Sequence, residues 1–168
     1  TIQQIFDDLT VIDATLTSVA DTGQCVARGD RQSNSTAASA ETGVIRLDNV
    51  PMVNGRLYEI RTNPLVGDCT VNADVIRLLL RINTAGVATT ASTNIALNQV
   101  RLADQTIGEV VSVGVLYAPG ATVTASILLS HSRASGTGNV NVNGSSVIPI
   151  QLMVIDMGEA PGDTGTDI

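Results

Sequence analysis

The chain has 168 residues, 43% of them hydrophobic, which is the size of one ordinary domain and enough apolar material for a packed core. Only 2% of the residues are aromatic, so Val, Ile, Leu and Ala must build that core, a composition that suits β-strands. The nine basic residues are all Arg, and sixteen carboxylates leave a net charge of −7; this argues against nucleic-acid binding, which needs clustered positive charge.

Apolar residues in the first 22 positions fall alternately three and four residues apart, as in the a/d seam of a heptad. These residues, which we call the N-terminal seam, are Ile2, Ile5, Leu9, Ile12, Leu16 and Val19. They predict a short amphipathic helix over residues 1–22 that serves for oligomerisation or anchoring. Leu at position a with β-branched residues at d favours three or four strands over two. Because the seam holds fewer than three heptads, the rest of the assembly must support it; the alternative is a helix packed on its own domain.

Residues 23–42 are small and polar, which predicts a linker or loop. The segment contains Arg28-Gly29-Asp30, the tripeptide that integrin ligands use. A tripeptide is a weak signal, and we interpret it as a solvent-exposed turn. The two cysteines, Cys25 and Cys69, form no CxxC pair, so we predict no metal site, while a single disulfide and two reduced thiols both stay open.

Residues 43–158 are predicted to form the folded domain. Eight strand-like runs are separated by turn pairs such as Asn54-Gly55, Gly67-Asp68 and Pro119-Gly120. The runs are residues 43–50, 55–62, 73–82, 94–103, 109–117, 121–134, 139–144 and 148–156. Since no helical pattern intervenes, the predicted fold is mainly β: an antiparallel β-sandwich or jelly roll of about eight strands, with the short N-terminal helix. Residues 159–168 are predicted to be an acidic flexible tail.

The sequence lacks the residue patterns of common catalytic sites. His131 is the only histidine, and strand alternation places it on the face of Ile127 and Leu129, so we expect it to be packed or hydrogen-bonded locally. Ser130 and Ser132 point to the opposite face and cannot form a nucleophile–base pair with it. No GxSxG, HExxH, P-loop or EF-hand motif occurs. We therefore expect a protein that is not an enzyme and has no cofactor or metal.

No segment of the sequence has the pattern of a membrane anchor. We expect no signal peptide, and no apolar run reaches the roughly 20 residues that a membrane helix needs. The longest candidate, residues 110–129, is interrupted by Pro119-Gly120 and diluted with Thr and Ser. We expect a soluble protein with no membrane partner.

Three segments carry a more specific pattern. Residues 131–140, HSRASGTGNV, contain an Arg-x-Ser-Gly-x-Gly turn, and residues 148–158, IPIQLMVIDMG, form an apolar run that closes with an acid and Gly. Residues 55–61, GRLYEIR, place a strand directly after a Gly-Arg turn. These segments resemble the small β-sandwich virion proteins of tailed phages, and the resemblance as a whole extends over about half of the chain.

The resemblance implies a structural virion protein that decorates the capsid or belongs to a head fibre or the tail. Combined with the N-terminal seam, it predicts a capsid decoration protein that oligomerises on the head surface and stabilises it. The expected partners are further copies of the chain, with a trimer favoured, and the major capsid protein or tail proteins. The alternative is a minor tail or fibre protein that recognises a host receptor or glycan. An exposed aromatic platform would favour that alternative, and only Phe6, Tyr58 and Tyr117 are available for one.

Overall fold

The computed structural model describes residues 23–161, which contain eleven strands and no helix. The strands are β1 (Gln24–Arg31), β2 (Thr42–Met52), β3 (Arg56–Thr62), β4 (Leu65–Cys69), β5 (Val75–Asn83), β6 (Thr93–Arg101), β7 (Glu109–Val111), β8 (Gly114–Tyr117), β9 (Val123–Ser135), β10 (Val140–Asn143) and β11 (Ile150–Glu159). The predicted helix over residues 1–22 lies outside the described residues, as does most of the predicted tail.

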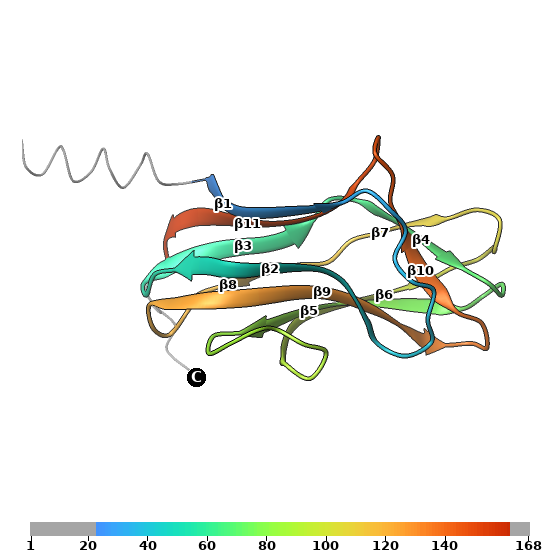
Figure 1. The fold of residues 1–168 in the computed structure, drawn as a ribbon, viewed down its shortest axis with the longest axis horizontal. Helices are drawn as coiled ribbons and strands as arrows, with labels where there is room; N and C mark the ends of the chain where they lie inside the picture. Colours follow the sequence, from blue (N-terminus) through green and yellow to red (C-terminus); the bar gives the residue numbers. More distant parts are fainter. Residues whose placement is uncertain (1–22, 162–168) are drawn as a thin grey trace, which may run out of the picture.

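The strands run lengthwise in two layers (Figure 1). One layer contains the sheet β1-β11-β3-β8, and the other contains the sheet β2-β9-β5-β6. A smaller sheet, β10-β4-β7, lies at the end opposite to the start of β1. Every pair of neighbouring strands is antiparallel. These findings confirm the predicted mainly-β, antiparallel, sandwich-like fold.

The core between the layers is aliphatic, as the low aromatic content requires. Its largest fully buried side chains are Tyr58, Met52, Ile60, Ile76, Leu78, Leu80, Leu102, Ile127, Leu129, Ile150, Leu152 and His131. Each buried aliphatic side chain of this size contributes about 1.5–3 kcal/mol relative to an exposed one. Tyr58 is 2% exposed, and its hydroxyl accepts a hydrogen bond from the backbone N–H of Val53 at 2.8 Å. It is therefore a core residue and not part of a binding platform.

Eleven strands replace the eight predicted because three features gave no clear signal. Residues 109–117 divide into β7 and β8, since β7 pairs with β4 whereas β8 pairs with β3. Gly67-Asp68, predicted to be a turn, lies inside β4. Gly67 fits there because it packs closely: a Cβ at this position would lie 3.2 Å from the Val111 side chain. The third addition is β1.

The prediction of a linker over residues 23–42 is wrong for its first half. Residues 24–31 form β1, an edge strand paired with β11. Val26 and Ala27 pack against the core, and Gly29 lies close to the side chains of Ile45 and Leu47. Backbone hydrogen bonds hold such a strand, so its composition does not reveal it. The Arg28-Gly29-Asp30 tripeptide therefore lies in a strand and not in a turn. Arg28 and Asp30 form an exposed ion pair with each other, at 3.0 Å between Nη2 and Oδ2.

A buried carboxylate organises the connection between β9 and β10. Asp74 is fully buried, and its Oδ1 accepts hydrogen bonds from the backbone N–H groups of Thr137 at 2.9 Å and Gly138 at 3.3 Å. Gly136 has φ +103°, and a Cβ there would lie 1.8 Å from Asp74 Oδ1. The turn therefore requires glycine at this position, because a side chain would collide with the Asp74 carboxylate that binds the backbone of the turn.

Candidate functional site

The residues predicted for oligomerisation or anchoring, the N-terminal seam from Ile2 to Val19, lie outside residues 23–161. Their role stays a prediction. The described chain does show where the seam leads, because β1 begins two residues after residue 22 and pairs with β11 along the edge of one sheet. The surface around the start of β1 is therefore the first part of the fold that the seam reaches.

His131 lies inside the core, on the face predicted from strand alternation. It is fully buried, and its Nε2 lies 3.0 Å from the Ser35 hydroxyl, which also accepts a hydrogen bond from the Val142 backbone N–H at 2.8 Å. Burial lowers the pKa of His131, as does the nearby Arg31 charge, although a hydrogen bond to the Thr36 backbone acts the other way. The imidazole is inaccessible to a substrate. Its bond to Ser35 joins β9 to the segment before β2, and the same Ser35 hydroxyl joins that segment to β10.

Acidification is expected to destabilise the protein through His131. The pKa of His131 is lower in the folded state than in the unfolded chain, where it is near 6.5. The contribution of the neutral imidazole to the free energy of unfolding is therefore complete above pH 6.5 and is lost as the pH falls below 6.5. Unfolding monitored by circular dichroism should show a loss of up to about 1 kcal/mol between pH 7.5 and 5.5. The carboxyls with lowered pKa values, such as Glu41, lose their contribution only below their ordinary range near 4. A His131→Asn variant should not lose stability between about pH 7.5 and 5.5. If the variant loses as much stability as the wild-type chain over this range, His131 is not the group responsible.

The chain's own loops cover the outer face of the β2-β9-β5-β6 sheet over its central strands, whereas Leu97 of the edge strand β6 is 48% exposed. Arg81 donates hydrogen bonds to both carboxylate oxygens of Glu41, each at 2.7 Å, and the Ser130 hydroxyl donates to the same carboxylate at 2.6 Å. Ala88, in the β5–β6 loop, is 1% exposed over this face. Ser130 is thus committed to a structural carboxylate and is not positioned as a nucleophile.

The outer face of the β1-β11-β3-β8 sheet is different, and we call it the open face. Its apolar side chains, all exposed or half-buried, are Cys25, Leu57, Leu116, Met153 and Ile155. The strand register places Cys25 opposite Ile155, Ile155 opposite Glu59 and Glu59 opposite Leu116, in one row across all four strands. Leu116 is 60% exposed. The open face is an apolar surface that the described chain leaves in contact with water.

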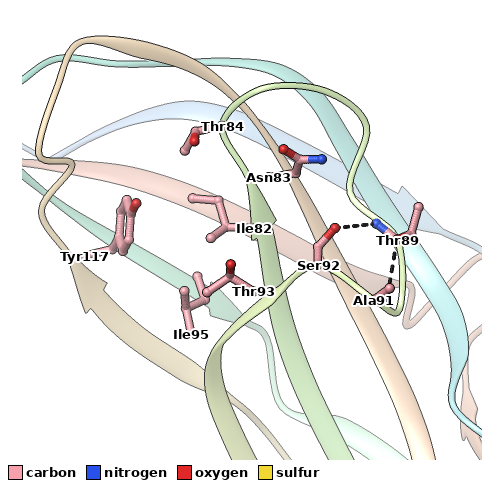
Figure 2. Close-up of a pocket in the computed structure, with 9 residues that line it drawn as sticks. All are labelled: Ile82, Asn83, Thr84, Thr89, Ala91, Ser92, Thr93, Ile95 and Tyr117. Atoms are coloured by element: carbon pink, nitrogen blue, oxygen red, sulfur yellow. Dashed lines mark hydrogen bonds between the residues drawn. The ribbon is translucent and has the colours of Figure 1, made fainter.

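A neutral groove lies between the β5–β6 hairpin and β8 (Figure 2). It has a volume of about 430 Å³, and none of its nine lining side chains is charged. Figure 2 shows the Tyr117 ring beside Ile82 and Ile95, with the hydroxyls of Thr84 and Thr93 bordering the same space. A half-exposed aromatic ring with nearby hydroxyls is chemistry suited to a neutral, hydroxyl-bearing ligand.

The two cysteines are both free, which resolves the alternative left open by the sequence. Cys25 is exposed in β1, whereas Cys69 is buried in β4, where burial raises the pKa of its thiol. Among residues 23–161, no three His, Cys, Asp or Glu side chains are grouped as metal ligands would be. The same residues contain no helix that would cross a membrane.

Comparison with known proteins does not assign the chain to a family. No protein-family model and no curated protein matches it. Among solved structures it is similar to the CBM22-1 and GH10 modules of the Clostridium thermocellum endo-1,4-beta-D-xylanase 10B complexed with xylohexaose, with 12% identity and a TM-score of 0.42, over 88% of this chain and 30% of that chain. It is also similar to Eiger TNF from S. frugiperda, with 9% identity and a TM-score of 0.33, over 83% of this chain and 99% of that chain. At these TM-scores neither similarity bears on function.

Sequence reasoning did not single out the open face, although a signal was present. The run from Leu152 to Ile155 is apolar in both registers of strand alternation. In the structure, Leu152 and Val154 are fully buried, while Met153 and Ile155 lie on the open face. A strand that is apolar on both faces indicates that both faces meet a partner.

Proposed function

We propose that the chain is a structural virion protein of a tailed phage, and that it is a capsid decoration protein that oligomerises on the head surface and stabilises it. The observation that carries the proposal is the open face, an apolar sheet surface beside the point where the N-terminal seam enters the fold. The phage-like segments support the same reading. They form β3, β11 and the Gly136-containing turn, which are structural parts of the sandwich.

Further support comes from what the described residues do chemically. The histidine is buried, and the serine beside it donates to a structural carboxylate. The buried Asp74 holds a turn, and the buried Asp156 binds Arg56 at 2.6 Å. Each of these side chains makes at least one hydrogen bond or ion pair within the fold, although Asp74 Oδ2 and His131 Nδ1 are buried without a partner. Such use of polar groups fits a structural role.

Removal of residues 1–22 is expected to reduce self-association. Light scattering should report a mass of about three chains for the intact protein and a smaller mass, down to one chain, for residues 23–168, because the truncated form lacks the seam. Gold-labelled intact protein added to phage particles should then appear on the head in electron micrographs. A monomeric intact chain, or label confined to other parts of the particle, would contradict the proposal for a capsid decoration protein.

A second candidate function is a minor tail or fibre protein that recognises a receptor or glycan on the host. The observation that favours it is the neutral groove at Tyr117, where an aromatic ring and hydroxyl groups face one space. The same labelling experiment separates the two candidates, because a tail or fibre protein places the label at the tail or fibre tips.

A further inference from the structure

We infer that the open face is the surface on which a second copy of this chain docks. The inference rests on the proposed self-association and adds the face that mediates it. Three observations carry it: the contrast between the two sheets, the charge balance of the open face, and the place where the chain enters β1.

The two outer faces of the sandwich differ in what covers them. On the β2-β9-β5-β6 sheet, the loop after β5 and the segment before β2 bury even outward-facing side chains, so that Leu79 and Leu128 are 4% and 7% exposed. On the open face, the outward side chains of the central strand β11, Met153 and Ile155, are only half-buried. At the edge strands the two sheets are alike, because Leu116 of β8 is 60% exposed and Leu97 of β6 is 48% exposed. A row of exposed and half-buried apolar side chains that crosses the strands of a sheet is typical of a protein–protein contact surface.

The charge on the open face suits contact between identical chains. Residues 23–161 carry ten carboxylates and nine arginines, a net charge of −1, and the other six carboxylates of the chain lie in residues 1–22 and 162–168. On the open face, two arginines and two carboxylates cancel. They form the pairs Arg28–Asp30, at 3.0 Å, and Arg61–Glu59, at 3.6 Å. The face therefore presents apolar side chains without net charge, and a second copy can approach it without long-range repulsion.

The entry point of the chain brings copies together at this face. Val19, the last residue of the N-terminal seam, precedes Gln24 by five residues, which span at most about 18 Å when fully extended. If the seam joins three chains, the start of each β1 lies within that distance of a shared axis. Cys25 and its cross-strand partner Ile155, both on the open face, are located there. The occupant nearest to the open face is then another copy of the same sheet.

A matched pair of leucines tests the inference in the full-length chain. Leu116→Glu places a carboxylate on the open face opposite Glu59, whereas Leu97→Glu makes the same change on the outer face of the other sheet, opposite Leu79, at a leucine that is 48% exposed. Light scattering over a concentration series should show at least about a tenfold rise in the dissociation constant for Leu116→Glu and no change for Leu97→Glu. Circular dichroism verifies that both variants are folded.

The exposed thiol of Cys25 provides a second readout, and the buried Cys69 does not interfere. A short bismaleimide should link intact chains into covalent dimers through Cys25, and Cys25→Ser should abolish the product. If the intact chain is an oligomer whose dissociation constant Leu116→Glu leaves unchanged, the open face is not the interface, while the proposed assembly role stands. If the intact chain is monomeric, both the proposed assembly role and the open-face interface are wrong. A monomer in which deletion of residues 1–22 makes Cys25 more reactive would show that the chain's own N-terminal segment covers the face.

Discussion

Replacing Gly136 by alanine is expected to lower the free energy of unfolding by about 3 kcal/mol, one of the largest effects of any single substitution outside the core. The added Cβ would lie 1.8 Å from Asp74 Oδ1 and 3.0 Å from the Asp74 Cα. Asp74 is fully buried and bonded to the backbone of the same turn, so it cannot rotate away without losing those hydrogen bonds. The positive φ of 103° adds backbone strain for any residue with a Cβ.

Gly120 provides the matched control for this substitution. It also lies in a turn, but a Cβ there meets no atom within 4 Å. Gly120→Ala should therefore change stability by less than about 0.5 kcal/mol. Thermal unfolding of the two variants should differ by roughly 10 °C in Tm. Equal Tm values would mean that Asp74 does not hold the β9–β10 turn as the structure indicates.

Replacing Glu41 by alanine is expected to cost about 2–3 kcal/mol, because it leaves the Arg81 guanidinium half-buried without its carboxylate. The side chains of Arg81 and Glu41 are only 16% and 21% exposed, and two hydrogen bonds of 2.7 Å join them. Burial alone would raise the pKa of Glu41, but hydrogen bonds from Arg81 and Ser130 hold it below its usual range. The carboxylate is therefore ionised at neutral pH, and the pair is a strong, bidentate one.

The exposed pair on β1 is the control for the buried one. Arg28 and Asp30 are joined at the same kind of distance, 3.0 Å, but their side chains are 51% and 36% exposed. Asp30→Ala should leave the urea unfolding midpoint nearly unchanged, because water screens a surface pair. The double variant Glu41→Ala/Arg81→Leu should recover part of the loss seen in Glu41→Ala. If Glu41→Ala is as mild as Asp30→Ala, the network is not a significant source of stability.

Strands with strong alternation or long apolar runs were predictable from the sequence. In β9, the residues Ile127, Leu129 and His131 lie in the core as alternation predicted. In contrast, β1 has the composition of a loop, and it joins the sheet only because it pairs with β11. The paired residues Arg31 and Ile150 are 119 positions apart in the sequence. No local pattern reports a partner so distant, because edge pairing uses backbone groups that every residue has.

The candidate sites depend still more on distant contacts. Cys25, Glu59, Leu116 and Ile155 come from four strands, and only the register between those strands places them in one row. The groove likewise joins Tyr117 of β8 to Ile82 of β5 and Ile95 of β6. Each residue is ordinary in its own segment. These residues form candidate sites only because strand pairing places them beside one another.

The sequence by itself determined the mainly-β class, the aliphatic core and the interior position of His131, because composition and period-two alternation act locally along each strand. The tertiary structure alone decided that β1 joins a sheet, that the two cysteines are free, and that loops cover the central strands of one outer face while the other face stays open. These features follow from contacts between segments far apart in the sequence, such as Gln24 of β1 and Asp156 of β11. A local sequence pattern does not indicate which distant strand edge or loop will pack against it.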